Sequence, residues 1–479
     1  MSDAAPVIFW FRQDLRLADN PGLAAAAASG RPVLAVYVLD DDNAGDWAPG
    51  AASRWWLHQS LASLADDLDG RLLLLRGKAD DCLPTLVEES AAHAVYWNRC
   101  YEPWRVRRDR KLKKALRDEG VPVHTYNGSL LFEPMHVSKE DGGPYKVYTP
   151  FWRKGCLENG PGVRELVEMP DDLRLAKAQG GLQLDELELM PSLDWYESLA
   201  EEWQPGEEGA RQRLERFLDE GIGNYKEGRD RPDKAYVSRL SPHLHHGEIS
   251  PQQVWYAARP LARKKKLEKD VDHFLSELGW REFSYNLLYH WPEITDDNLQ
   301  KKFNRFPWKK SMKDLDCWQR GETGYPIVDA GMRELWQTGY MHNRVRMIVG
   351  SFLVKNLMLH WHHGERWFWD TLVDADLANN SASWQWVAGS GADAAPYFRI
   401  FNPVLQGKKF DPDGEYVRRY LPELAKLPDK HLQAPWEAPA EVLEEAGIEL
   451  GRDYPKPIVD LKGSRERALA AFKSLSSDD

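Results

Sequence analysis

The first 130 residues alternate between short apolar runs and longer helical patterns, and this alternation constrains the fold most strongly. Apolar runs bounded by turn residues predict buried strands, and here they read "VIFWF", "PVLAVYVL", "RLLLLRG", "HAVYWN" and "VPVHTYN". Helical patterns such as "ASRWWLHQSLASLADDL" lie between them. Strands that alternate with helices indicate a parallel, doubly wound sheet. No G-x-G-x-x-G follows the first run, so the dinucleotide fingerprint is absent, although ligands can still bind at the carboxyl ends of such strands.

The pattern changes further along the chain. Residues 131–205 are rich in Gly, Pro and charge, which predicts a long connection that wraps on the surface rather than a disordered one. From residue 206 to 479 helical periodicity dominates, as in "DVDHFLSELGWREFSYNLLYH". We therefore predict an α/β fold with a Rossmann-like doubly wound domain over 1–130, a linker over 131–205 and an all-helical domain over 206–479.

Composition excludes several classes of protein. A net charge of −12 argues against a protein that coats nucleic acid, but it leaves room for a local basic face. There is no long uncharged apolar run and no secretory signal pattern, so we expect neither a membrane span nor export. The cysteines match no zinc or disulfide spacing, which favours a reduced cytoplasm and no metal site: Cys82, Cys100, Cys156 and Cys317. The 21 tryptophans suggest stacking surfaces, an aromatic cofactor or redox work, and an aromatic helical core is the plainer alternative.

Two helical patterns place chemistry-bearing residues on shared faces. In "FLSELGWREFSYN", Trp280 and Arg281 follow Glu277 by three and four residues. In "GYMHNRVRMI", Asn343 and Met347 share a face. Taken alone, the first pattern is typical of a surface ion pair beside a core indole, and the second of an ordinary amphipathic helix.

The segment "DADLANNSASWQWVAGSG" concentrates acids, amides and indoles. If it is helical, Asn380 and Trp384 share a face, and Trp386 lies roughly 200° further round the axis than Trp384. "GSG" suits a left-handed helix end, and the preceding acids suit a helix start. Basic residues gather nearby in sequence, and they suit either a phosphate-binding rim or a solvated surface: Lys309, Lys310, Arg344, Arg399, Lys408 and Lys409.

Together these segments resemble the photolyase/cryptochrome family, closest to bacterial enzymes of class I or class III that repair cyclobutane pyrimidine dimers. The likeness spans nearly the whole chain, through long strings such as "VIFWFRQDLRLADNPGL", "ELGWREF", "TGYPIVDAGMREL", "DADLANNSASWQW" and "DAAPYFRIFNP". It implies FAD in the helical domain and a flipped-out lesion. The implied reaction is light-driven electron donation from reduced FAD to the dimer in DNA, after which the ring splits and the electron returns.

The resemblance also implies residue roles. The FAD contacts would be Tyr225, Val237, Ser238, Arg239, Leu240, Ser241, Arg344, Asp374, Ala375, Asp376 and Asn380. Within this set Arg344 pairs with Asp374 and Asn380 faces flavin N5; the family often has Thr where Val237 stands, which leaves a side-chain bond there in doubt. The lesion and its DNA would contact Glu277, Trp280, Arg281, Asn343, Met347, Trp386 and Arg399. An electron chain would run through Trp384, Trp361 and Trp308.

Alternative functions within and outside the family require different residues. Photolyases of 6-4 photoproducts place histidines in the pocket helix, where this chain has Asn343 and Met347, with His342 next door. A cryptochrome, a blue-light signalling protein, often alters the lesion pocket or adds a long tail. An unrelated flavin oxidoreductase needs a nicotinamide site, which we do not find. We expect a monomer that binds UV-damaged DNA, double- or single-stranded.

An antenna chromophore is the remaining question. The family often carries methenyltetrahydrofolate or a deazaflavin. "CYEPWRVRRD" has Trp104 and Arg105 where folate-binding class I enzymes show an Asn-Glu pair. "AASRWWLHQSL" and "GGPYKVYTPFW" are nearer to class III, which favours folate, and the alternative is no antenna.

Overall fold

A computed structural model describes residues 5–169, 173–177, 180–264, 266–393 and 398–475. The chain forms two compact units. The first unit comprises Met1–Gly223, Ser238–Pro292 and Val373–Ala378. The second comprises Asn224–Val237, Glu293–Leu372 and Asn379–Asp479. Each unit is described below by itself.

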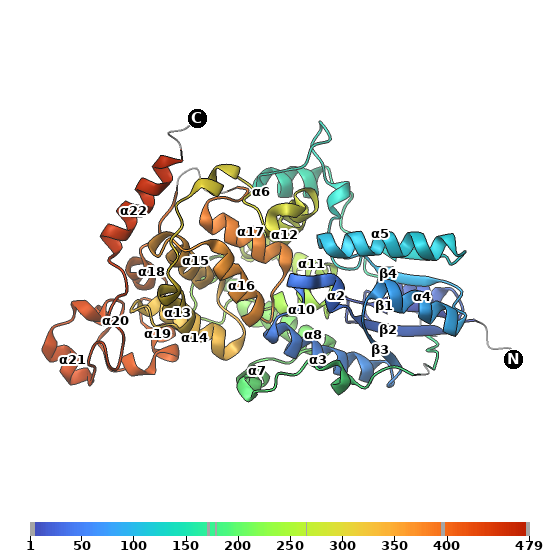
Figure 1. Ribbon diagram of the computed structural model, residues 1–479, viewed down its shortest axis with the longest axis horizontal. Helices are drawn as coiled ribbons and strands as arrows, with labels where there is room; N and C mark the ends of the chain where they lie inside the picture. The colour runs from blue at the N-terminus through green and yellow to red at the C-terminus, as the bar shows by residue number, and fades with distance from the viewer. Residues whose placement is uncertain (1–4, 170–172, 178–179, 265, 394–397, 476–479) are drawn as a thin grey trace. The chain divides into compact units, whose positions relative to one another are not determined.

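The first unit contains a parallel sheet of five strands, drawn in blue in Figure 1. The strands are β1 (Val7–Phe11), β2 (Val33–Leu39), β3 (Leu72–Arg76), β4 (Val95–Asn98) and β5 (Val123–Tyr126). Their order is β3-β2-β1-β4-β5, and in the register Phe9 lies between Ala35 and Tyr96. Because the strand order reverses at β1, the carboxyl ends of β1 and β4 form a topological switch point, where such sheets bind ligands.

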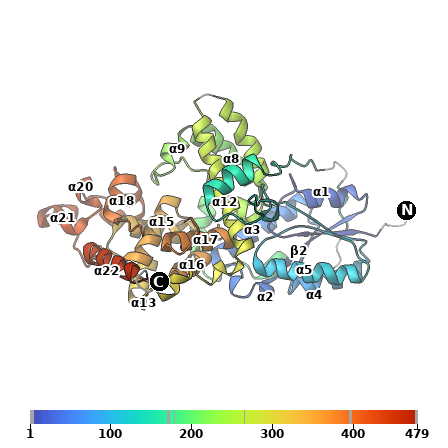
Figure 2. The ribbon, with the colours of Figure 1, turned by 90° about the horizontal axis from the view of Figure 1, so that it is seen from above.

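Helices cover both faces of this sheet (Figure 2). On one face Phe9 and Phe11 join the core formed with α1 (Pro21–Ala28) and α3 (Ala51–Asp67). On the other face Ile8 and Trp10 join the core formed with α4 (Ala79–Ser90) and α5 (Pro103–Asp118). Since both faces of β1 are buried, the strand reads as a continuous apolar run instead of an alternating one. The predicted doubly wound sheet is confirmed.

The first unit has further α-helices, the longest of which is α12 (Glu268–His290). They are α2 (Asp41–Ala44), α6 (Tyr148–Pro150), α7 (Glu197–Glu202), α8 (Glu207–Arg216), α10 (Ser241–His246), α11 (Pro251–Ala258) and α12 (Glu268–His290). Helix α12 has 23 residues and buries apolar side chains at helical spacing, among them Val271, Phe274, Leu275 and Leu278. That buried side holds α12 in place and so orients the residues on its other sides.

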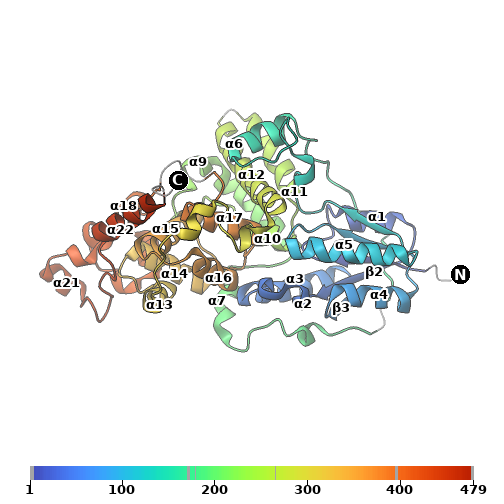
Figure 3. The same cartoon turned by 45° about the horizontal axis from the view of Figure 1, so that its top comes forward.

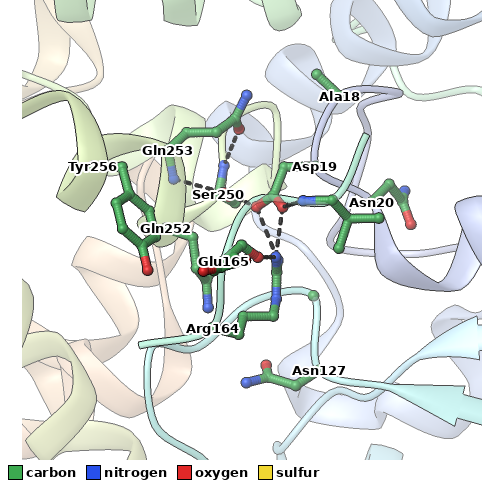
Figure 4. A network of polar contacts seen from close by, with 12 residues as sticks. Ala18, Asp19, Asn20, Asn127, Arg164, Glu165, Ser250, Gln252, Gln253 and Tyr256 are labelled. Carbon is green, nitrogen blue, oxygen red and sulfur yellow. Dashed lines mark hydrogen bonds and ion pairs between the residues drawn. The ribbon is translucent and has the colours of Figure 1, made fainter. Parts of the chain in front are cut away.

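The predicted long connection is fastened to the first unit by a buried carboxylate (Figure 4). Asp19 accepts two hydrogen bonds from the Arg164 guanidinium, at 2.5 and 2.8 Å, and one from the main-chain N–H of Val167 at 2.9 Å. The hydroxyl of Ser250, which caps α11, donates to the same carboxylate. Burial raises the pKa of Asp19, but these hydrogen bonds outweigh burial and lower it. One ionised side chain therefore ties the β1–α1 loop, the connector and α11 together.

The second unit is helical (Figures 1 and 3; helix α9, Tyr225–Gly228, is green in Figure 3 and the other helices run from yellow to red). Its helices are α9 (Tyr225–Gly228), α13 (Met312–Arg320), α14 (Pro326–Thr338), α15 (Asn343–Ser351), α16 (Trp361–Thr371), α18 (Pro403–Phe410), α19 (Glu415–Tyr420), α20 (Asp429–Leu432), α21 (Ala440–Ala446) and α22 (Leu461–Ser474). Helix α17 (Leu377–Ala388) begins in the first unit and continues into the second. The predicted fold class, an N-terminal α/β part and a helical C-terminal part, is confirmed, whereas the domain boundaries at residues 130 and 205 stay predictions.

In the described part of the chain, no helix combines the length and the apolar character that a membrane crossing requires.

Candidate functional site

Helix α12 carries the first predicted group, Glu277, Trp280 and Arg281, and its helical spacing is confirmed. The Trp280 indole stacks on Tyr148, with ring centroids 3.8 Å apart and planes 10° apart. Arg281 donates to the main-chain oxygen of Ser129 at 2.8 Å. Glu277 is half-buried. The stacking partner holds the plane of the indole, as a platform for a flat ligand requires.

Glu282, which the sequence analysis did not single out, anchors this helix. Its carboxyl group accepts from the main-chain N–H of Phe132 at 2.9 Å. Burial raises its pKa to about 7, although Arg281 and backbone donors act in the opposite direction. The bond joins the loop after β5 to α12 and so positions Arg281 and its neighbours. In sequence Glu282 is one acid in an amphipathic helix, and only the contact with a residue 150 positions away reveals its role.

A second group of the first unit lies at Asp374–Asp376. The Ser241 hydroxyl, at the start of α10, donates to Asp374 at 2.6 Å. Asp376 accepts from the Tyr285 hydroxyl and lies 3.5 Å from Nδ1 of His245. Burial raises the pKa of Asp376, but His245, Arg281 and the Tyr285 hydroxyl outweigh burial and bring it to about 2. Asp376 is therefore an ionised carboxylate, which can only accept hydrogen bonds. Ala375 between the two acids is buried.

The loop before α10 contains the Ser238–Leu240 stretch. Arg239 has a φ of 52°, an uncommon value for a residue with a side chain, and its guanidinium lies 4.4 Å from the Trp203 ring centroid. It also pairs with Glu202. Such backbone strain at a non-glycine residue often marks a ligand-binding loop.

The second unit holds the other predicted FAD residues. Tyr225 is buried, with the Arg229 guanidinium 5.8 Å from its ring centroid. Val237 has no side-chain donor, so it offers a ligand only backbone groups and an apolar surface. Arg344 pairs with Asp230 at 2.7 Å, and its guanidinium lies 4.5 Å from the Phe410 ring centroid. The predicted pairing of Arg344 with Asp374 stays a prediction, and Asp230 is a partner that the sequence analysis missed.

At the start of helix α15 the lesion-pocket candidates are accessible, whereas the neighbouring histidine is buried. His342 is the N-cap; its Nδ1 accepts from the main-chain N–H of Arg344 at 3.2 Å, and its ring is buried. Burial lowers the pKa of His342 to about 4, so the imidazole is neutral at neutral pH. Asn343 is exposed and Met347 is half-buried one turn later. The histidine thus serves the helix end, and the exposed side of this turn carries an amide and a thioether.

Helix α17 is helical over Leu377–Ala388 and ends before Gly389 at φ 91°, as its sequence predicts. The amide nitrogen of Asn380 donates to the main-chain oxygen of Glu365 at 2.9 Å, which holds the side chain in one orientation. The Ser381 hydroxyl donates to the Glu365 carboxyl group at 2.6 Å. Burial raises the pKa of Glu365 to about 8, and the Ser381 hydrogen bond only partly opposes this shift. The residue whose main-chain oxygen holds Asn380 therefore has a protonated carboxyl group at neutral pH.

The two indoles of "WQW" point to different sides, as the helical spacing predicts. Trp384 is buried, with ring centroids 5.0 Å from Phe368 and 6.2 Å from Trp318. Gly364 makes this possible, because a Cβ there would lie 2.1 Å from the Trp384 ring. Trp386 is half-buried, and its indole N–H donates to the main-chain oxygen of Asp393 at 3.2 Å.

The other relay candidates lie in the same unit. Trp361 is buried at the start of α16, and its indole N–H donates to the Asn298 side chain at 2.9 Å. The Trp308 ring lies 4.4 Å from Phe306 and 5.0 Å from His360.

The predicted basic residues are mostly exposed. Lys309, Lys310, Arg399, Lys408 and Lys409 all lie in contact with solvent. The ammonium group of buried Lys355 donates to the main-chain oxygen of Arg399 and so ties down the backbone that carries it. This exposure fits either a phosphate-binding rim or a solvated surface.

Comparison with known proteins identifies the family. The DNA photolyase model matches residues 7–170, and the model "FAD binding domain of DNA photolyase" matches residues 274–474. A deoxyribodipyrimidine photo-lyase of Agrobacterium fabrum is 50% identical over 98% of both chains. The chain belongs to the photolyase and cryptochrome family. A class III photolyase from Agrobacterium tumefaciens has a structure with a TM-score of 0.95, at 50% identity over 99% of this chain and 98% of that one. Cryptochrome-2 of Arabidopsis thaliana is 40% identical over 97% of this chain and 78% of its own.

The side chains described above fit FAD by their chemistry. A flavin presents N–H donors and carbonyl acceptors along its edge, and FAD adds a diphosphate. Asp376 is an ionised acceptor, Asn380 is an oriented amide, and Arg239 and Arg344 are cations. In the first unit the candidate FAD residues are Ser238–Ser241 and Asp374–Asp376, and in the second unit they are Tyr225, Val237, Arg344 and Asn380.

The raised pKa of Glu365 makes stability depend on pH. Because this pKa lies near 8 instead of 4.5, the folded state binds the proton more tightly, so the contribution is complete below pH 4.5 and is lost as pH rises through 8. Glu365→Gln removes the titrating group, and its free energy of unfolding should rise relative to wild type by roughly 1–3 kcal/mol between about pH 5 and 8. Chemical denaturation at several pH values measures this difference.

Glu441→Gln is the matched control, since Glu441 is exposed. Parallel pH curves for wild type and Glu365→Gln would show that the Glu365 carboxyl titrates normally.

Proposed function

We propose that the protein is a deoxyribodipyrimidine photo-lyase, a carbon–carbon lyase that uses FAD and blue light to split cyclobutane pyrimidine dimers in DNA. The observation that carries this choice of lesion is helix α15. It exposes Asn343 near Met347 and buries His342 as its cap, so no imidazole is placed on this turn for acid–base work on a 6-4 photoproduct. The Agrobacterium fabrum relative bears the name of this activity.

In this proposal the chain binds and orients the extruded lesion. Trp280, held by Tyr148, and Trp386, held through its indole N–H, supply the two aromatic surfaces that sandwich the dimer. Asn343 and Met347 complete the pocket, and Glu277 hydrogen-bonds a pyrimidine carbonyl. Arg281 and Arg399 position phosphates. When bound in its reduced form, FAD supplies the electron that opens the cyclobutane ring and receives it back, so the reaction has no net redox change.

A different set of residues would bind FAD and supply it with electrons. When FAD is bound, Asp376 and Asn380 would hydrogen-bond the flavin edge, and Ser238–Ser241 and Tyr225 would hold the phosphates and ribose. Trp384, Trp361 and Trp308 pass electrons inward when the flavin has become oxidised.

Repair of a defined lesion tests the function. Reduced protein under blue light should remove thymine dimers from DNA and leave 6-4 photoproducts in place, and Glu277→Gln should lower the repair yield by roughly tenfold or more. Chromatography of digested DNA after illumination measures both lesions. Glu268→Gln, an exposed acid on the same helix, is the control and should retain full repair.

Two results contradict the proposal. Removal of 6-4 photoproducts alone would point to the other photolyase class. Binding of FAD without light-dependent removal of either lesion would favour a cryptochrome-like signalling protein, the function named for the Arabidopsis relative.

The relay assignment makes a separate prediction. Trp384→Phe keeps an aromatic ring against Phe368 but is harder to oxidise, so photoreduction of oxidised FAD should slow by roughly tenfold or more. Repair by chemically reduced protein should stay close to wild type. Trp436→Phe, outside the proposed relay, is the control. Equal loss of photoreduction and repair would show that Trp384 has another role.

For the antenna we propose methenyltetrahydrofolate at the switch point of the sheet. Side-chain atoms there are buried and have no hydrogen-bond partner in the described part of the chain: Trp10 Nε1, Arg12 Nε, Asp41 Oδ1, Glu102 Oε2 and Arg105 Nε. The Trp104 ring lies under the guanidinium groups of Arg105 and Arg108, at 4.6 and 5.0 Å. Buried atoms without a hydrogen-bond partner suit the polar edge of a pterin. Arg105, which also pairs with Glu102 at 3.5 Å, suits the glutamate tail, and the alternative ligand is a deazaflavin.

Reconstitution distinguishes these chromophores. Added methenyltetrahydrofolate should copurify with the protein and add a near-ultraviolet absorption band, which Trp104→Ala should abolish. Retention of a deazaflavin instead, or of neither compound, would contradict the folate assignment.

A monomer in a reducing cytoplasm stays part of the proposal, and the free cysteines are in keeping with that compartment: Cys82, Cys100, Cys156 and Cys317.

A further inference from the structure

The sequence "HWHHGER" places three histidines around Trp361. His360 is the N-cap of α16, and its Nδ1 accepts from the main-chain N–H of His362 at 3.2 Å. Since Nδ1 accepts this bond, the proton of a neutral imidazole must be on Nε2. The ring is therefore held at one end by the helix start, immediately before an indole of the proposed relay.

The His360 ring contacts both outer tryptophans of that relay. Its centroid lies 5.0 Å from Trp308, at an interplanar angle of 65°, and 5.6 Å from Trp361, at 27°. His362 also contacts Trp361, with centroids 4.0 Å apart. Within the described residues, no ring contact joins Trp308 directly to Trp361. His360 thus provides a continuous path of packed rings between the two indoles.

The surroundings keep this ring uncharged. Burial lowers the pKa of His360 to about 4, and the charges of His362 and His363 act in the same direction. Burial lowers the pKa of His362 and of His363, Arg366 lowers both further, and Asp296 opposes these effects only at His362. A cation at 5.0 Å would repel the positive charge that an oxidised Trp308 carries. A neutral ring between the indoles avoids this repulsion.

We propose that His360 is a positioning residue of the electron relay, whose ring couples Trp361 to Trp308. The inference rests on the relay in the proposed function. In the step concerned, one electron passes from Trp308 to oxidised Trp361, which becomes a neutral indole again. Trp308 is left one electron short and is reduced by a thiol from solution. His360 gains and loses neither an electron nor a proton. Its role is to fill the space between Trp308 and Trp361 with an uncharged aromatic ring.

Two substitutions separate the ring from the helix cap. His360→Asn keeps a side-chain acceptor suited to the N-cap and removes the ring. His360→Phe keeps a ring and removes both the acceptor and the titratable nitrogens. The matched control is His363→Asn, because His363 belongs to the same histidine cluster but is exposed.

The measurement is photoreduction of oxidised protein by a thiol, followed by flavin absorption and by transient absorption of the tryptophan radicals. We expect His360→Asn to slow electron transfer from Trp308 to Trp361 by about tenfold, which equals roughly 1.4 kcal/mol of barrier. His360→Phe should stay close to wild type near neutral pH. Wild type should lose rate as pH falls toward about 4, and this loss should be smaller in His360→Phe. His363→Asn should behave as wild type near neutral pH, where His360 is neutral in both proteins.

Photoreduction of Trp308→Phe and of His360→Asn distinguishes an error about His360 from an error about the relay itself. If Trp308→Phe leaves photoreduction unchanged, the relay assignment is wrong. If Trp308→Phe slows it but His360→Asn does not, the relay stands and His360 serves only as a helix cap. Histidine NMR gives a readout independent of the cofactor: His360 should remain the neutral Nε2–H tautomer near neutral pH, and a charged ring there would overturn the proposal.

Discussion

The close contact between Trp384 and Gly364 determines how the candidate site of the second unit is built. A side chain at residue 364 would collide with the indole, so only glycine lets α16 and α17 approach this far. Their approach brings Asn380 and Ser381 of α17 within hydrogen-bond distance of Glu365 on α16. Trp361 stands at the start of the same helix. The amide orientation, the protonation of Glu365 and the beginning of the proposed relay all depend on one small residue.

Burial and the partners that compensate it, more than residue type, set the charge of each ionisable group near the site. Asp376 and Glu365 are both buried carboxyl groups, yet the pKa of Asp376 is about 2 and that of Glu365 about 8. The difference arises because Asp376 has His245, Arg281 and a tyrosine hydroxyl as partners, whereas Glu365 has one serine hydroxyl. His342 and His360 each cap a helix, and burial lowers the pKa of both. A charge survives burial here only where partners compensate it.

Much of the fold and part of the site could be predicted because their signals are local. Continuous apolar runs indicate strands buried on both faces, and β1 has that burial. Helical spacing predicts that Trp384 and Trp386 diverge, and they do. The roles of Glu282 and Lys355 were not predicted, because their partners, Phe132 and the Arg399 backbone, are distant in sequence. Nothing in a local pattern distinguishes such residues from ordinary surface charges.

The sequence by itself determined the strand and helix pattern, the family and the identity of the candidate residues, since these follow from periodicity and from long specific strings. Only the tertiary structure decided which groups are charged and which rings touch. It paired Arg344 with Asp230, buried His342 away from Asn343, and placed the His360 ring against Trp308 and Trp361. The physical reason is that desolvation and ring contact depend on which distant segments meet, and a linear pattern carries no such distances.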